Sequence, residues 1–173
     1  RRVLFRSLAQ RGDLGLFFVS GVQIDQHANY NLHQLGPMDV PHTRFPGGYG
    51  GGMIFYGARR TVIFRTELTR RSFPAKVDFI SAAGDTPSEY LRHGHPSKVV
   101  TPKANFHFDK AAGILRLGAV HPGYTFEEVK ENTGFDVGVT SAPMTPAPTE
   151  EELATLRGPI RKKMIDNGAY AAW

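Results

Sequence analysis

A glycine-rich loop is the feature of this sequence that most limits what the chain can fold into. Five of the six residues from Gly47 to Gly52 are glycine, and an apolar segment, Met53 to Ala58, follows at once. Because glycine has no Cβ, a ligand can approach the main chain closely. If the apolar segment is a helix, its first N–H groups point out of the loop without intrahelical acceptors. The loop therefore predicts either a site for an anion or oxyanion, or a tight turn that binds nothing.

Two common phosphate-binding motifs do not fit this loop. The P-loop pattern G-x-x-x-x-G-K-[ST] ends in Lys followed by Ser or Thr, and that ending is missing here. The dinucleotide-binding fingerprint G-x-G-x-x-G is not matched cleanly either.

The composition indicates one globular domain. Hydrophobic residues make up 40% and charged residues 21% of the 173 residues, which suits a chain that buries a core. The sequence has no cysteine, which excludes disulfides, thiolate zinc sites and Cys nucleophiles, and we expect a cytoplasmic protein. No apolar run approaches the roughly 20 residues of a membrane span, and the net charge of +5 comes without a dense basic stripe. We therefore expect neither a membrane nor a nucleic acid as partner.

Residues 1–7 are excluded from the predicted fold. The segment from Arg2 to Ser7 resembles the translated end of a sequencing-library adapter, so we expect these residues to be an artefact. A single domain is predicted over residues 8–173, with its N-terminal part missing.

The patterns along the chain predict an α/β fold with an open, mainly parallel sheet flanked by helices. Asp13 to Val22 is a continuous apolar run, typical of a strand buried on both faces of a parallel sheet. Thr61 to Thr66 and Val77 to Ser81 are two further strand candidates. Lys98 to Val120 contains two extended runs joined by DKAAG, which predicts an antiparallel hairpin.

Two helices are predicted after the hairpin. Thr125 with Glu128, and Thr149 with Glu152, have the spacing of capping boxes. After the second box, Leu153, Leu156, Ile160 and Met164 fall on one helical face.

A polar segment follows the first predicted strand, at the position where open α/β sheets bind ligands. In an extended chain its alternating polar residues would share one face, and we take them as substrate-pocket candidates. They are Gln23, Asp25, Asn29 and Asn31. The alternative is a turn in which Asn and Asp side chains hydrogen-bond to the local backbone.

Neither a metal site nor a catalytic carboxylate is predicted. His27, His33 and His42 do not have the spacing of a standard ligand set. Glu67 lies close to Arg65, and we interpret it as part of a solvated ion pair rather than as a nucleophile.

Six segments, taken in order, resemble the β subunit of class I CoA-transferases, namely glutaconate CoA-transferase-like proteins and the related steroid ring-opening CoA hydrolases. They are GVQIDQHANYN, RFPGGYGGG, TRRSFPAKVDFI, VVTPKANFHFD, AVHPGYTFEEVKENTGFD and TPAPTEEELATLR. GYGGGM is similar to the family loop G-x-G-G-A-x, with Gly52 where Ala is common. QIDQHANYN is similar to Q-x-D-x-x-G-N-x-N, with Ala28 where Gly is usual. The resemblance extends from Leu8 to about Ile160.

The resemblance implies the fold shared by CoA-transferases and ribose-5-phosphate isomerases. It also implies an enzyme that moves CoA from an acyl-CoA to a carboxylic acid through a glutamyl-CoA thioester. CoA is then a substrate rather than a permanently bound cofactor, and an α subunit completes a heterodimer or heterotetramer. The loop would bind CoA or an oxyanion through Gly48, Gly50, Gly51 and Gly52. The nucleophilic glutamate is expected upstream or in the partner subunit, so no catalytic residue of this chain is named.

Two alternatives share parts of this pattern. One is a subunit of an acyl-CoA ring-opening hydrolase in steroid degradation. The other is a phosphosugar isomerase or effector-binding sensor domain of the same broad fold, which would bind a phosphosugar at the glycine loop and need no α subunit. Fold alone does not separate these functions, but the order of the six segments favours an acyl-CoA enzyme over the phosphosugar alternative, and it leaves transfer and hydrolysis open.

Overall fold

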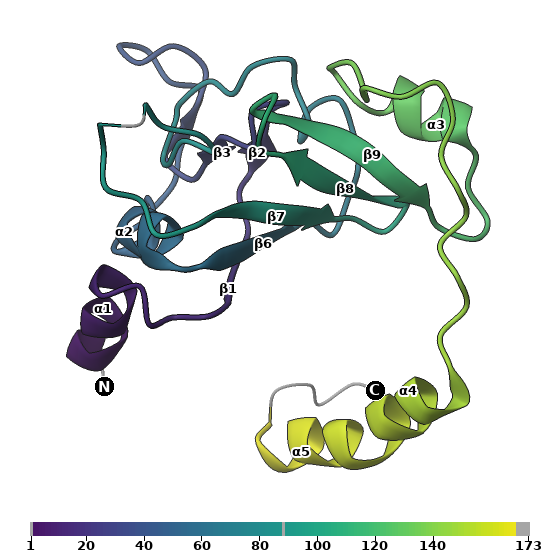
Figure 1. The fold of residues 1–173 in the computed structure, drawn as a ribbon. Helices are drawn as coiled ribbons and strands as arrows, with labels where there is room; N and C mark the ends of the chain where they lie inside the picture. Colours follow the sequence, from purple (N-terminus) through teal and green to yellow (C-terminus); the bar gives the residue numbers. More distant parts are fainter. Residues whose placement is uncertain (1, 88, 169–173) are drawn as a thin grey trace.

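A five-stranded sheet with the strand order β1-β6-β7-β8-β9 forms the centre of the molecule (Figure 1). The computed structural model describes residues 2–87 and 89–168. Strands β1 (Phe17–Val19), β6 (Arg60–Phe64) and β7 (His95–Val100) run parallel to one another. Strands β8 (Ala104–Asp109) and β9 (Ile114–Val120) continue the sheet as an antiparallel hairpin. The predicted α/β class and the predicted hairpin are confirmed.

Two short antiparallel pairs lie outside this sheet. Strand β2 (Gln23–Ile24) pairs with β3 (Tyr30–Asn31), and β4 (Gln34–Leu35) pairs with β5 (Thr43–Arg44).

The strand predicted over residues 77–81 is wrong, because that segment is irregular. Its N–H groups bond to other parts of the chain instead of to a ladder. The Val77 N–H donates to the Asp25 carboxylate, and the Ser81 N–H donates to the Tyr30 carbonyl.

Helices α1 (Arg2–Gln10) and α2 (Gly51–Gly57) pack against each other at one end of the sheet (Figure 1). Residues 2–7, which we expected to lie outside the domain, belong to α1. Helix α2 confirms the helix predicted after the glycine loop. Its last residue, Gly57, lies so close to the Ala9 backbone that a side chain at this position would collide with it.

The C-terminal part is helical. Helix α3 (Phe126–Glu131) begins at the predicted Thr125 capping box, and α4 (Glu150–Thr155) begins at the predicted Thr149 capping box. A π-helical segment, η1 (Leu156–Ile160), and helix α5 (Arg161–Asp166) follow directly. Figure 1 shows α4 and α5 extending away from the sheet.

One face of the sheet is buried and the other is open. Ile63, Val99 and Phe106 belong to the buried core, which also contains Phe55 of α2 and Val129 of α3. On the opposite face the side chains are Phe18, which is 59% exposed, and the register partners Phe64 and Val100, which are also exposed. The prediction that the first strand is buried on both faces is therefore wrong for the described part of the chain.

Candidate functional site

The glycine loop (Gly47–Gly52) connects β5 to α2. Gly47 and Tyr49 have φ angles of 83° and 47°, and these two left-handed residues turn the chain into the helix. The turn is closed by the Gly51 N–H, which donates to the Gly48 carbonyl over 2.6 Å.

The first turn of α2 follows, with Gly50 as its N-cap residue. The N–H groups of Gly52 and Met53 lie in this turn and have no acceptor within the helix. They are therefore the main-chain donors that the loop can offer to a ligand, in place of the Gly51 N–H.

Three side chains lie beneath this loop. A Cβ placed on Gly51 would stand 3.5 Å from the Tyr30 hydroxyl, and one on Gly47 would stand 3.0 Å from Nε2 of His33. His33 Nδ1 lies 2.6 Å from Oγ of Ser81. Because Ser81 Oγ already accepts the Leu32 N–H, its own hydrogen is available to His33 Nδ1. The other ring nitrogen of His33, Nε2, is directed toward the loop.

The Tyr30 hydroxyl is the most unusual group near the loop. Tyr30 is fully buried, and its hydroxyl has no hydrogen-bond partner among the described residues. Burial, and to a smaller extent the nearby Tyr56, raises the pKa of Tyr30 to about 12. The hydroxyl therefore stays neutral at physiological pH and keeps a hydrogen to donate. Such a group costs about 1–3 kcal/mol of stability as long as it has no partner.

The four polar residues that we predicted as substrate-pocket candidates form a closed hydrogen-bonded turn, the Gln23–Asn31 turn. Asp25 is 2% exposed and accepts the N–H groups of His27 and Asn29 as well as the Asn29 amide. Asn31 donates to the side-chain oxygen of Gln23 over 2.8 Å. These polar groups are directed at one another, which favours the turn over a substrate pocket.

Ala28 lies within this turn and has a φ angle of 56°. A residue with a Cβ is strained in this left-handed region, and glycine is not. The chain thus keeps the backbone conformation of the glycine that is usual in the family pattern, although the side chain is Ala.

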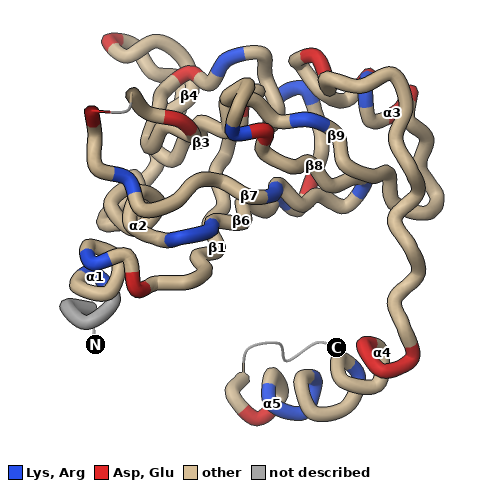
Figure 2. Tube along the Cα trace, viewed as in Figure 1, with Lys and Arg blue, Asp and Glu red and all other residues tan. Residues whose placement is uncertain are grey.

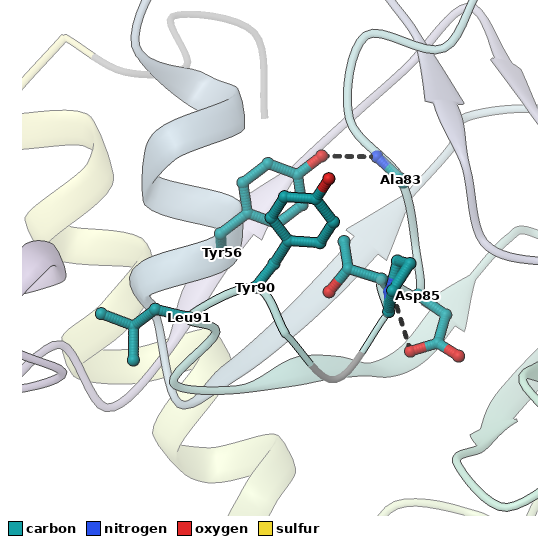
Figure 3. A pocket seen from close by; sticks show the side chains of 7 residues that line it. Tyr56, Ala83, Asp85, Tyr90 and Leu91 are labelled. Atoms are coloured by element: carbon teal, nitrogen blue, oxygen red, sulfur yellow. Dashed lines mark hydrogen bonds between the residues drawn. The ribbon is translucent and has the colours of Figure 1, made fainter.

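A pocket of about 400 Å³ lies one turn further along α2, and we refer to it as the α2 pocket (Figure 3). Its lining consists of Tyr56, Ala83, Asp85, Thr86, Pro87, Tyr90 and Leu91. The Ala83 N–H donates to the Tyr56 hydroxyl over 2.9 Å, which fixes the ring against the wall. Sequence reasoning did not identify this pocket, because its two walls come from segments far apart along the chain.

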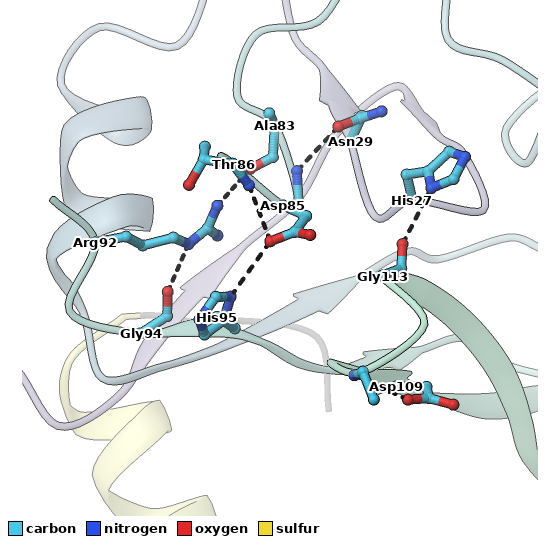
Figure 4. Close-up of polar contacts among 12 residues, drawn as sticks. His27, Asn29, Ala83, Asp85, Thr86, Arg92, Gly94, His95, Asp109 and Gly113 are labelled. Carbon is cyan, nitrogen blue, oxygen red and sulfur yellow. Dashed lines mark hydrogen bonds and ion pairs between the residues drawn. The ribbon is translucent and has the colours of Figure 1, made fainter. Parts of the chain in front are cut away.

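Arg92 lies next to Ala83, on the segment that lines the pocket (Figure 4). Its guanidinium lies over the rings of Phe55 and Tyr56, 5.2 Å and 5.0 Å from their centroids. Nε donates to the Gly94 carbonyl and Nη1 to the Ala83 carbonyl, while Nη2 is buried without a partner among the described residues. Burial lowers the pKa of Arg92 from its usual value.

Asp85 carries the charge of the pocket lining. Its Oδ1 accepts the Thr86 N–H and lies 3.9 Å from Nδ1 of His95. Burial is the main reason that the pKa of His95 is lowered, and the nearby Arg92 lowers it further. The Asp85 side chain is 49% exposed, so its carboxylate faces the solvent side of the pocket.

Other kinds of site receive no support from the described residues. None of their His, Asp and Glu side chains form a group of three that could hold a metal ion. No helix in residues 2–87 and 89–168 is both long and apolar enough to cross a bilayer. Figure 2 shows Lys and Arg distributed over several elements. Glu67, 40% exposed, pairs with Arg65, which confirms the predicted ion pair.

The sequence has relatives among CoA-transferases and hydrolases. It is 33% identical over 150 residues to the B subunit of glutaconate CoA-transferase from Acidaminococcus fermentans, an alignment that covers 83% of this chain and 56% of that protein. It is 30% identical over 161 residues to the B subunit of 3-oxoadipate CoA-transferase from Pseudomonas knackmussii, covering 89% and 62%. It is 34% identical over 142 residues to the IpdB subunit of the cholesterol ring-cleaving hydrolase from Rhodococcus jostii, covering 78% and 55%. The chain thus spans about half to three fifths of the length of these relatives.

Solved structures of the same kinds of protein are also similar to this chain. The crystal structure of Rhodococcus jostii IpdAB gives a TM-score of 0.79 at 29% identity, over 94% of this chain and 68% of that one. Glutaconate coenzyme A-transferase from Acidaminococcus fermentans also gives 0.79 at 29% identity, over 94% and 66%. The family description Coenzyme A transferase matches residues 2–132, which is more than half of the sequence. The chain therefore belongs to the Coenzyme A transferase family.

Proposed function

We propose that this chain is part of the β subunit of an acyl-CoA:carboxylate CoA-transferase that works together with an α subunit. The family of the chain supports this proposal, and so do two of its relatives, which are B subunits of CoA-transferases. The observation that carries it is the glycine loop, whose helix offers the Gly52 and Met53 N–H groups above the unpartnered Tyr30 hydroxyl. The expected cytoplasmic location stays a prediction.

In the proposed reaction a glutamate carboxylate attacks the acyl-CoA thioester, and CoA is then held as a glutamyl thioester until an acceptor acid takes it. Each step develops a tetrahedral oxyanion, which preorganised N–H donors stabilise. We assign this task to the loop formed by Gly48, Gly50, Gly51 and Gly52, with the Gly52 N–H as the donor, since the Gly51 N–H is already bonded to Gly48. The glutamate is proposed to lie upstream or in the α subunit, and CoA is a substrate.

The open face of the sheet is consistent with a second subunit. Phe18, Phe64 and Val100 remain exposed there, and burying such side chains stabilises an interface by about 25 cal/mol per Å² of apolar surface.

The test is to combine the full-length β subunit with its α subunit and measure CoA transfer from an acyl-CoA to a carboxylic acid. Turnover is expected for this pair and not for the 173-residue chain alone. Turnover by the chain alone that Glu67→Gln abolishes would contradict both the proposal and the ion-pair interpretation of Glu67. Product formation that does not depend on the acceptor acid would indicate the hydrolase alternative, for which the similarity to the IpdB subunit is the support.

Ligand class is tested separately by calorimetry of the same pair. CoA is expected to bind, and ribose 5-phosphate is not. Tight binding of the phosphosugar without binding of CoA would favour the isomerase or sensor alternative instead.

A further inference from the structure

We propose that the α2 pocket holds the acyl group of the thioester and selects a neutral acyl group with a ring over one that ends in a carboxylate. This inference rests on the proposed function, because it takes the glycine loop as the place where the thioester carbonyl binds.

The position of the pocket supports an acyl group as its occupant. Gly52 and Tyr56 are four residues apart on α2, so they lie on the same helical face, one turn of about 5.4 Å apart. The segment of Ser81 to Ala83 runs along this face, since Ser81 O and the Ala82 Cβ are the atoms nearest to a Cβ on Gly52. The Ala83 N–H then reaches the Tyr56 hydroxyl. A thioester carbonyl at the loop would thus place its acyl chain next to the pocket, whereas the nucleotide of CoA is separated from the thioester by the whole pantetheine arm.

The lining favours an apolar ring. Two tyrosines, Pro87 and Leu91 supply most of the wall. Tyr90 and Leu91 are 63% and 83% exposed, so a ligand that covers them removes apolar surface from water. A volume of about 400 Å³ lies in the range of small-molecule pockets, roughly 300–1,000 Å³.

The charge of the pocket opposes a terminal carboxylate. Asp85 is the charged residue of the lining, and a carboxylate next to it would face a like charge. The Arg92 guanidinium donates to the Gly94 and Ala83 carbonyls and does not line the pocket, so Asp85 is the charge that the lining itself presents to a ligand. A hydroxyl on the ring, in contrast, can donate to the Asp85 carboxylate.

The experiment compares three probes, CoA, cyclohexylacetyl-CoA and adipyl-CoA, by calorimetry on the chain joined to its α subunit. Cyclohexylacetyl-CoA is expected to bind at least about tenfold more tightly than CoA, and adipyl-CoA is expected to bind no more tightly than CoA. Tyr90→Ala should remove the gain of cyclohexylacetyl-CoA over CoA. Asp85→Asn should strengthen adipyl-CoA binding about tenfold relative to CoA binding.

Glu89→Gln is the matched control, since Glu89 is an exposed carboxylate on the same loop that does not line the pocket. If the three probes bind equally, or if Glu89→Gln acts like Asp85→Asn, the pocket assignment is overturned although CoA binding still supports the proposed function. Tighter binding of adipyl-CoA than of cyclohexylacetyl-CoA would overturn the selectivity. Failure of all three probes to bind would overturn the proposed function, and this inference with it.

Discussion

The Gln23–Asn31 turn and the glycine loop are both polar stretches that the sequence marks as candidate sites, but they use their hydrogen-bonding groups in opposite ways. In the turn, Asp25 and Asn31 are buried and bond to the residues around them. In the loop, the first turn of α2 keeps main-chain N–H groups without helical acceptors, above the unpartnered hydroxyl of Tyr30.

This difference separates a structural polar cluster from a binding site. A buried group that is fully hydrogen-bonded stabilises the fold, and it has no capacity left for a ligand. A donor without a partner reduces stability and can recover that loss only when something binds. Substitutions in the turn should therefore change stability, and substitutions in the loop should change catalysis.

The largest effect is expected for Gly51→Val in the complete enzyme. We expect kcat to fall about 10²–10³-fold, equivalent to about 3–4 kcal/mol, because the valine crowds the acyl oxygen and the loop donors. Gly51 does not have a positive φ, and an added Cβ meets the Tyr30 hydroxyl at an ordinary 3.5 Å. The melting temperature should therefore change little.

Gly15→Val is the matched control, because Gly15 lies outside the glycine loop, has no positive φ, and has no atom within 4 Å of a Cβ at that position. It should leave kcat close to that of the wild type. If Gly51→Val melts early and keeps its kcat below that temperature, the loop is a structural turn and the comparison fails.

The next largest effect is expected for Asp25→Ala, measured by urea denaturation. Four donors from His27, Asn29 and Val77 lose their acceptor, so the free energy of unfolding should fall by about 2–4 kcal/mol. Asp25→Asn, which keeps one acceptor oxygen, should lose less. A loss of kcat with unchanged unfolding would instead restore Asp25 as a substrate-pocket residue.

The variant Tyr30→Phe tests the role of the unpartnered hydroxyl through the pH dependence of stability. The pKa of Tyr30 is raised from 10.0 to about 12, so between these pH values the unfolded chain ionises while the folded chain stays protonated. Stability should therefore fall as pH rises through this window, by roughly 2–3 kcal/mol in total. Tyr30→Phe should lack this part of the fall and be about 1 kcal/mol more stable at pH 7. Identical alkaline unfolding curves for the two proteins would show that burial does not raise the pKa of Tyr30.

The smallest effect is expected for Ala28→Gly. Removing the Cβ at a φ of 56° should raise the free energy of unfolding by about 0.5–1 kcal/mol. Ala82→Gly removes a buried Cβ at a residue without positive φ and should lower it. If both substitutions destabilise the protein equally, strain at Ala28 is absent.

Features that depend on neighbours in sequence were predictable. Both capping boxes join residues three positions apart, and the hairpin around DKAAG is local as well. The groups around the loop were not predictable, because His33 and Ser81 are 48 residues apart and meet only in the folded chain. The strand predicted at Val77 failed for the same reason, since its N–H donates to Asp25, 52 residues away.

Two glycines bracket the wall of the α2 pocket that contains Asp85 and Tyr90. Gly84 lies against the backbone of His27 and Ala28, and Gly94 lies against the backbone of Ala58 and Arg59, so neither position has room for a side chain. Both ends of this segment are thus held where the backbone passes so close to another stretch of backbone that only glycine fits. Exposed residues between the two anchors, such as Asp85 and Tyr90, can be exchanged without disturbing the sheet, so evolution or a protein engineer can alter the acyl preference of the proposed enzyme there.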